Sequence, residues 1–244
     1  MLSLGLENVD LTERDFRRIS ALVHEHCGIN LHDGKKELVR ARLSKRLRMG
    51  KFKSFDQYMK HVMEDETGRE FSILIDSLST NLTSFFRENQ HFEYLRQIFL
   101  PGQIEKKQRT GKKRLRIWSA GCSSGEEPYS LAITLLESVQ NPANWDIRIL
   151  ATDISTRMLD SARQGLYPEQ RVQPVPPVLK TRYLIKEKTK EGTFYRAGNN
   201  LKKVIVFRYL NLMEDWPVRG PVDCIFCRNV MIYFDKPTQQ KLIN

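Results

Sequence analysis

Alternating strand-like and helix-like segments are the feature that most narrows the fold of this chain. From about Leu115, apolar runs of strand length alternate with amphipathic helical segments. The strand-like runs are LRIWSAG, IRILATD, VIVFRYL and DCIFCRNV, and helices are predicted over residues 126–138 and 155–164. This alternation is typical of an α/β domain whose parallel sheet carries helices on both faces. The run DCIFCRNV is apolar enough to be expected in a strand that is buried on both sides.

The first 80 residues show only helical signals. Thr12 stands where a helix N-cap is expected, apolar residues follow it at helical spacing, and Gly28 is a predicted stop. A second helix is predicted from Asp33 to Met49, closing at Gly50, with Val39, Leu43 and Leu47 as its buried stripe. Helical signals continue through residues 55–78. We therefore expect a small all-helical domain over residues 1–80 and a second domain over residues 81–244.

Residues 168–203 interrupt the alternation of strands and helices. They begin with a proline-rich segment and continue as RYLIKEKTKEGTFYRAG, which predicts a hairpin around Lys190-Glu191-Gly192. We expect a small antiparallel β-subdomain inserted into the second domain. A basic segment at residues 106–113 is predicted to be a flexible loop.

Composition excludes several classes of protein. No apolar run approaches the roughly 20 residues of a membrane helix, and the amino terminus does not resemble a signal peptide. A cytoplasmic protein without membrane insertion is therefore expected. The four cysteines and five histidines offer no convincing ligand set, and Cys224 and Cys227 are interpreted as strand cysteines. We predict no metal site.

The net charge is +11, and the basic residues are unevenly distributed along the chain. Between Lys35 and Lys53, nine lysines and arginines accompany a single acid, Glu37. Arg42, Lys45 and Arg48 are spaced to lie on one exposed flank of the predicted helix. This flank is either an ordinary solvated helix face or a surface that docks an acidic partner.

The stretch IWSAGCSSGEEPYS, residues 117–130, resembles a nucleotide-binding turn, but it carries acids where phosphate is usually held. Its glycines do not match the dinucleotide pattern, although Asp153 ends the next strand, where an acid binds ribose hydroxyls. Glu126 and Glu127 would repel a pyrophosphate at about 4 Å by several kcal/mol. S-adenosylmethionine has the adenosine without the phosphate, and its other end is cationic, so it fits better. Alternatively, both glutamates simply complement the helix dipole.

Five motifs together resemble the chemotaxis receptor methyltransferase family, CheR. They are TNLTSFFRE (80–88), WSAGCSSGEEPYS (118–130), ILATDIS (149–155), YLNL (209–212) and FCRNVMIYFD (226–235). Members of this family transfer a methyl group from S-adenosylmethionine to glutamate side chains of chemoreceptors. The resemblance implies a helical amino-terminal domain and a class I, Rossmann-like methyltransferase domain with an inserted antiparallel β-subdomain. The family fold continues with a helix and three more strands, so we expect these C-terminal strands to be missing here and the fourth strand to be an unpaired edge.

The resemblance also implies roles for individual residues. The implied cofactor-binding residues are Asn81, Thr83, Arg87, Glu127, Asp153, Asn211, Leu212, Arg228 and Asn229. We hypothesise that Arg87 and Tyr233 are catalytic and orient the attacking carboxylate. From the residues alone, Asn81 and Thr83 could instead be helix caps, Arg87 a surface charge, and Leu212 a core residue.

The resemblance further implies a partner, the cytoplasmic helical domain of membrane chemoreceptors, and S-adenosylhomocysteine as the second product. Arg42, Lys45 and Arg48 would then be the docking residues, and the protein is expected to be a monomer that binds no nucleic acid. A truncated scaffold that binds cofactor or receptor without transfer is one alternative. A nucleic-acid methyltransferase is another, favoured by the net charge but opposed by Cys227-Arg228-Asn229-Val230, which replaces the Asp/Asn-Pro-Pro-aromatic turn of such enzymes.

Overall fold

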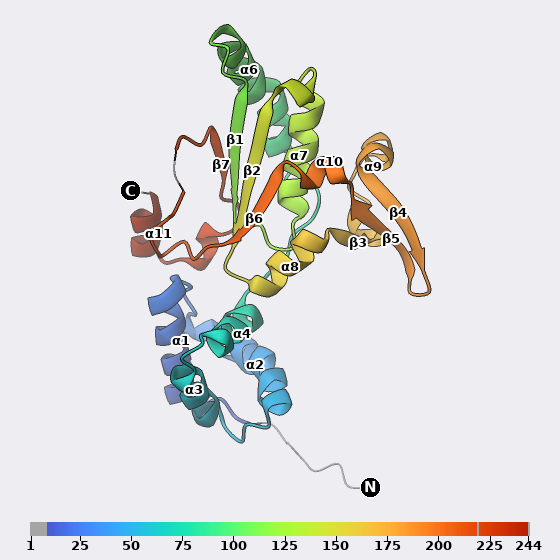
Figure 1. The fold of residues 1–244 in the computed structure, drawn as a ribbon. Coiled ribbons are helices and arrows are strands. Elements are labelled where there is room, and N and C mark those ends of the chain that lie inside the picture. Colours follow the sequence, from blue (N-terminus) through green and yellow to red (C-terminus); the bar gives the residue numbers. More distant parts are fainter. Residues whose placement is uncertain (1–8, 219, 244) are drawn as a thin grey trace. The chain divides into compact units, whose positions relative to one another are not determined.

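The computed structural model describes residues 9–218 and 220–243, and the chain divides into two compact units (Figure 1). The first unit contains the described residues up to Thr80, residues 211–215 and those from Asn229 onward; the second contains residues 81–210 and 216–228. In the described part of the chain, no helix has the length and apolar character needed to cross a membrane.

The first unit is helical, as predicted. Its helices are α1 (Glu13–Cys27), α2 (Lys36–Gly50), α3 (Phe55–Glu64), α4 (Arg69–Leu78) and α11 (Lys236–Ile243), with 3-10 turns at Asp33–Lys35 and Met231–Tyr233. Thr12 caps α1 by accepting from the backbone N–H of Asp15, and Gly28 ends this helix with φ 71°.

Helix α2 buries the predicted stripe of Val39, Leu43 and Leu47. Its end differs slightly from the prediction. Gly50 is still helical, and Lys51 takes the left-handed conformation that closes the helix.

The second unit is built on a parallel sheet in the order β6-β2-β1-β7 (Figure 1). Its strands are β1 (Arg114–Ala120), β2 (Asp146–Asp153), β6 (Ile205–Tyr209) and β7 (Cys224–Phe226). Helices α7 (Glu126–Ser138) and α8 (Thr156–Gln164) follow β1 and β2, with a 3-10 turn at Pro142–Asn144, and both helices contact the sheet. Ile117, Ile149 and Ile205 lie side by side in register and are buried. The predicted alternation of strands and helices is confirmed.

Two predictions for the second unit are wrong. The fourth strand contains three residues instead of eight, and Ile225 is 52% exposed instead of buried. Among the described strands, β7 pairs only with β1. The basic segment before β1, residues 106–113, is a loop only in its second half, because residues 106–109 belong to a helix. Residues 90–109 form a continuous helical stretch of α5 (Gln90–Tyr94), a π-helical turn (Leu95–Phe99) and α6 (Leu100–Arg109), and the chain turns only at Gly111.

The inserted subdomain begins at Leu166 and has the predicted hairpin. Its antiparallel sheet has the order β3-β5-β4, with β3 (Leu166–Pro168), β4 (Leu184–Thr189) and β5 (Gly192–Ala197). A 3-10 turn (Glu169–Val172) and the helices α9 (Pro177–Tyr183) and α10 (Asn199–Lys202) complete it, as Figure 1 shows in orange. The subdomain is attached to the end of α7, where the carboxylate of Glu137 accepts from Tyr183 Oη at 2.6 Å and from Arg182 Nη1 at 2.7 Å.

The attachment at Glu137 predicts a pH-dependent contribution to stability. The hydrogen bond from Tyr183, followed by Arg182, lowers the pKa of Glu137 below 4.5. A depressed carboxyl pKa stabilises the fold above the unfolded-state value, and this stabilisation is lost as pH falls through the folded-state value. We expect Glu137→Gln to cost about 1 kcal/mol at neutral pH, since the site is partly exposed, and the deficit to shrink as pH falls below 4.5 and through the folded-state pKa.

Urea unfolding across this pH range measures the effect. Glu105→Gln, which removes an exposed partner of Arg109 on α6, is the matched control and should change stability little at any pH. A deficit in Glu137→Gln that did not vary with pH would contradict the prediction.

Candidate functional site

The order of the strands identifies where a ligand is expected. The chain proceeds from β1 to β2 and then to β6 in one direction, and it returns to place β7 on the other side of β1. In parallel α/β sheets, ligands bind outside the carboxyl ends of the strands where this direction reverses. The segments that leave β1 and β7 at this point carry Glu127 and Arg228, both of which the sequence resemblance had singled out.

The loop between β1 and α7, residues 121–125, is here called the cofactor loop, because the resemblance implies a cofactor beside it. Its backbone is fixed to the end of β2. The N–H groups of Gly121 and Cys122 both donate to the carbonyl of Thr152 at 2.8 Å, and that of Ser123 donates to Asp153 Oδ2 at 2.7 Å. Asp153 also accepts from the N–H of Ser155 at 2.8 Å and is only 8% exposed. Asp153 therefore shapes the turn at the end of β2.

Glu127 is a buried carboxylate with two partners. Its Oε1 accepts from Ser119 Oγ at 2.7 Å, and its Oε2 accepts from Nε and Nη2 of Arg228, each at 2.8 Å. Burial raises the pKa of Glu127, while the charge of Arg228 and the hydroxyl of Ser119 oppose this shift. Most of the negative charge of Glu127 is consequently balanced inside the protein.

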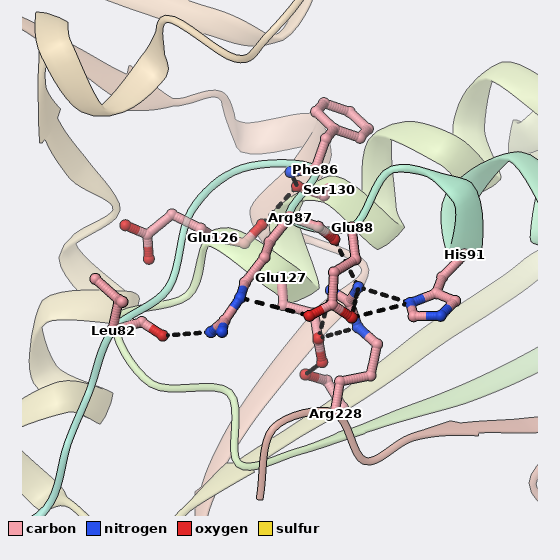
Figure 2. Close-up of polar contacts among 10 residues, drawn as sticks. Leu82, Phe86, Arg87, Glu88, His91, Glu126, Glu127, Ser130 and Arg228 are labelled. Atoms are coloured by element: carbon pink, nitrogen blue, oxygen red, sulfur yellow. Dashed lines mark hydrogen bonds and ion pairs between the residues drawn. The ribbon is translucent and has the colours of Figure 1, made fainter.

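Arg228 is the centre of the contacts in Figure 2. Its Nη1 donates to the backbone carbonyl of Arg87 at 2.6 Å and lies 3.2 Å from His91 Nδ1, with Glu88 3.9 Å away. The guanidinium carbon lies 5.0 Å from the ring centre of Phe92 and 5.5 Å from that of Phe226. These rings keep water away from the guanidinium, which strengthens the ion pair with Glu127.

The linker that carries Arg87 has a strained backbone. Phe86 and Glu88, on either side of Arg87, have φ values of 52° and 53°. Such conformations cost about 1–3 kcal/mol each in bulky residues and persist only where the surroundings impose them. Here the N–H of Phe86 donates to Ser130 Oγ at 3.0 Å, and Arg228 holds the carbonyl of Arg87. The guanidinium of Arg87 turns back to the carbonyl of Leu82 at 2.8 Å (Figure 2).

In the second unit, hydrogen bonds therefore connect five of the residues implied by the resemblance, in two groups. Asn81 joins the cofactor loop because its carbonyl accepts from Ser123 Oγ at 3.0 Å, and that loop is bound to Asp153. Arg87, Glu127 and Arg228 form the other connected group. Thr83 is half-buried in the same linker.

The remaining four implied residues belong to the first unit. The side-chain amide of Asn211 donates to the carbonyl of His26 and to Glu214 Oε1, and Asn211 is 4% exposed. Tyr233 Oη donates to the carbonyl of Thr80 at 3.2 Å. Leu212 is half-buried, and Asn229 has φ 57°.

The predicted docking flank on α2 is not uniform. Lys45 and Arg48 are exposed, and neither has an ion-pair partner in the described part of the chain. Arg42 is half-buried instead, because its guanidinium donates to the carbonyl of Leu78 and to Thr80 Oγ1 at 2.9 Å. The prediction that all three side chains are simply exposed is wrong for Arg42.

Sequence reasoning missed several residues around these groups. Glu88, which lies inside the motif TNLTSFFRE, could have been noted as a charged neighbour of Arg87. His91, Phe92 and Ser119 had no pattern that indicated their contacts. Arg171 of the inserted subdomain, which pairs with Glu126, also gave no signal beyond its charge.

The pairing of Arg228 with Glu127 predicts a large effect of breaking it. Arg228→Met leaves a buried carboxylate without its cation, and we expect a loss of about 3–5 kcal/mol of unfolding free energy in urea. The double variant Glu127→Gln/Arg228→Met should recover a substantial part of this loss, because no buried charge remains unpaired.

Arg96→Met is the matched control. Arg96 is 52% exposed and pairs with Glu93 on the helix surface, so its removal should change stability little. Equal stabilities for the variants at positions 228 and 96 would show that the buried pair is not important for the fold.

Two family models match this chain. The model described as CheR methyltransferase, all-alpha domain, matches residues 14–79, and the model described as CheR methyltransferase, SAM binding domain, matches residues 81–244.

Relatives of known name are similar along almost the whole chain. The chemotaxis protein methyltransferase of Borreliella burgdorferi is 43% identical over 97% of this chain and 83% of its own length. Chemotaxis protein methyltransferase 2 of Pseudomonas aeruginosa is 41% identical over 98% of this chain and 82% of its own, and the chemotaxis protein methyltransferase of Escherichia coli is 38% identical over 97% and 80%. Together with the helical first unit and the parallel sheet that carries an inserted antiparallel subdomain, these matches show that the chain belongs to the CheR methyltransferase family.

Proposed function

We propose that this chain transfers the methyl group of S-adenosylmethionine to the side-chain carboxylates of specific glutamates on chemoreceptors, giving glutamate methyl esters and S-adenosylhomocysteine. Membership of a methyltransferase family supports the reaction class, and the matched SAM binding domain supports the cofactor. The observation that carries the proposal is the pair of buried carboxylates at the carboxyl ends of adjacent strands: Asp153 is the last residue of β2, and Glu127 lies in the first turn of the helix that follows β1.

The chemistry of these residues suits a cofactor without phosphate. Glu126 and Glu127 occupy the first turn of α7, where a phosphate would otherwise receive backbone N–H groups. Each glutamate has an arginine partner, Arg171 and Arg228 respectively. With all groups ionised, these two pairs are neutral and Asp153 adds one negative charge. The electrostatic repulsion of phosphate is therefore weaker than the sequence suggested, but the acids still occupy the anion-binding position.

The proposed roles follow from this chemistry and from the family resemblance. Asp153 would accept from the ribose hydroxyls, and Glu127 would face the cationic end of the cofactor. Asn81, Thr83, Arg87, Arg228 and Asn229 would complete the cofactor contacts, and Asn211 with Leu212 would flank the adenine. When bound, S-adenosylmethionine supplies an electrophilic methyl group on a positively charged sulfur.

The substrate does not need activation by a base. A glutamate side chain has a pKa near 4.3, so it is already a carboxylate nucleophile at neutral pH. The protein would contribute alignment of this carboxylate and exclusion of water. Arg87 is suited to attract the carboxylate, since its guanidinium is about one third exposed, and its neighbours Phe86 and Glu88 both have left-handed backbone conformations. We propose Tyr233 as the second orienting residue.

The proposed partner is the cytoplasmic helical domain of membrane chemoreceptors, and the protein would act in the cytoplasm as a monomer. Lys45 and Arg48 are exposed cations on α2 and could contact an acidic receptor surface. Arg42 would contribute mainly by fixing Thr80 through its hydrogen bond.

Calorimetry with S-adenosylhomocysteine, followed by transfer of a radiolabelled methyl group to receptor-bearing membranes, tests the proposal. We expect binding and base-labile label on the receptors. Binding without transfer would support the scaffold alternative, and label in added DNA or RNA would support the nucleic-acid alternative.

Arg87→Ala and Tyr233→Phe should lower turnover on the order of tenfold to a hundredfold, because a misplaced carboxylate reacts slowly. Arg96→Ala and Tyr94→Phe, at exposed positions, are the controls. Wild-type turnover in both test variants, with unchanged cofactor affinity, would exclude their catalytic role.

A charge reversal tests the docking surface. Lys45→Glu/Arg48→Glu should raise the KM for receptor about tenfold at low salt while the affinity for S-adenosylhomocysteine stays constant, since charge attraction steers and orients association. The difference from wild type should shrink at high salt, where screening shortens the range of the charges to about 3 Å at 1 M.

The double variant Lys106→Glu/Arg109→Glu, on α6, is the control for charge reversal. Arg42→Glu is measured separately because its side chain has a structural contact. Unchanged receptor kinetics would identify the flank as an ordinary solvated surface.

A further inference from the structure

The cofactor loop contains one residue, Ser123, in a conformation that its residue type does not favour. Gly121, Ser123 and Gly125 have φ values of 77°, 48° and 98°. For a serine, the left-handed conformation costs roughly 1–2 kcal/mol. The two glycines adopt positive φ without strain, so Ser123 is the residue whose conformation depends on neighbours that hold it. The contacts with Thr152, Asp153 and Asn81 hold its first half, up to Ser123.

The second half of the loop is held by the inserted subdomain. Tyr167, on β3, donates from its hydroxyl to the carbonyl of Ser124 at 2.7 Å. Arg171, in the 3-10 turn that follows β3, donates from Nη2 to Ser124 Oγ at 2.8 Å and forms an ion pair with Glu126. Ser124 Oγ in turn donates to Glu126 Oε2 at 2.8 Å. The subdomain thus contacts both the loop and the first helical residue after it.

These contacts are closely packed and are buried except at Arg171, whose side chain is 39% exposed. Ser124 is 3% exposed, Tyr167 1% and Glu126 0%. A Cβ atom at Gly125 would lie 2.9 Å from both Tyr167 Oη and Ala162 Cβ, so only glycine permits this approach. The guanidinium of Arg171 also lies 5.7 Å from the ring centre of Tyr167. The subdomain therefore fits against the loop rather than touching it with a single side chain.

Removing the cation of Arg171 would affect the cofactor loop directly. Burial raises the pKa of Glu126, and Arg171 is the main group that opposes this shift. Without Arg171, the carboxylate would have to take up a proton or move toward water. Either change would disturb Ser124 and the first turn of α7, where the adjacent residue is Glu127.

We propose that the inserted subdomain is part of the cofactor site, with Arg171 acting as a positioning residue that sets the cofactor loop through Ser124 and Glu126. This inference rests on the proposed function for the identity of the ligand. It assigns to the subdomain a role in binding S-adenosylmethionine that is separate from any contact it makes with a receptor.

A second attachment of the same subdomain provides an internal control. Arg182 pairs with Glu137 near the other end of α7, about 16 Å along the helix from Glu126. Arg182→Met loosens the subdomain without touching the cofactor loop. A general weakening of the fold would be reproduced by Arg182→Met, whereas a specific effect on the loop would not.

Titration calorimetry of the full chain with S-adenosylhomocysteine tests the inference. We expect Arg171→Met to raise the Kd at least tenfold, and steady-state assays to show a raised KM for S-adenosylmethionine with kcat largely retained. Arg182→Met should bind as wild type. Arg171→Lys, which keeps the charge, should recover part of the affinity, and so should Glu126→Gln/Arg171→Met, which leaves no unpaired buried charge.

The possible results separate the two proposals. If wild type does not bind S-adenosylhomocysteine, the proposed function fails. If wild type binds and folded Arg171→Met binds equally well, or if Arg182→Met weakens binding as much, only the present inference is overturned.

If Arg171→Met does not fold, Tyr167→Phe replaces it in the test, because Tyr167→Phe removes only the hydroxyl that bonds to Ser124. A Kd raised severalfold supports the inference, and an unchanged Kd overturns it.

Discussion

The ion pair between Glu127 and Arg228 is the interaction on which the geometry at the carboxyl ends of the parallel strands depends. A carboxylate on the first turn of α7 is buried there, and burial of an unpaired charge is unfavourable by several kcal/mol. The guanidinium that compensates it comes from the segment after β7 and also binds the carbonyl of Arg87. One cation thus joins three segments that lie far apart in the sequence.

The two adjacent glutamates of α7 are tied to different parts of the second unit. Glu127 is bound to the segment after β7, whereas Glu126 is bound to Arg171 of the inserted subdomain. The start of the helix is therefore fixed from two sides, and the acids are more than a complement to the helix dipole. Because each acid has its own cation, the two pairs add no net charge at the start of α7 when all four groups are ionised.

Backbone strain is concentrated near the same interactions. Phe86, Glu88 and Ser123 are non-glycine residues in the left-handed conformation, and hydrogen bonds from other segments hold Phe86 and Ser123. A polypeptide retains such conformations where its neighbours determine the local geometry more strongly than its own preferences do. The linker around Arg87 and the cofactor loop are therefore defined by their surroundings rather than by local preference.

The sequence by itself determined the elements of this protein. The spacing of apolar residues predicted the helices of the first unit, the strands that follow Leu115 and the hairpin around Gly192, because burial of one face imposes a period that can be seen without coordinates. The motifs likewise indicated the family and marked Arg87, Glu127, Asp153 and Arg228. The helical stretch over residues 90–109, the shortness of β7 and the exposure of Ile225 were not foreseen, since neither a basic composition nor an apolar run shows which neighbours will pack against a segment.

Only the tertiary structure decided how the charges are paired. Nothing in the sequence connects Glu126 to Arg171, Glu127 to Arg228, or Arg42 to Thr80, because each pair joins segments separated by dozens of residues. Whether an acid at a helix start is free to meet a ligand or is already balanced depends on these long-range contacts. Periodicity fixes which residues are buried, but the partner of a buried charge is fixed by chain topology, which brings distant segments to the same edge of the sheet.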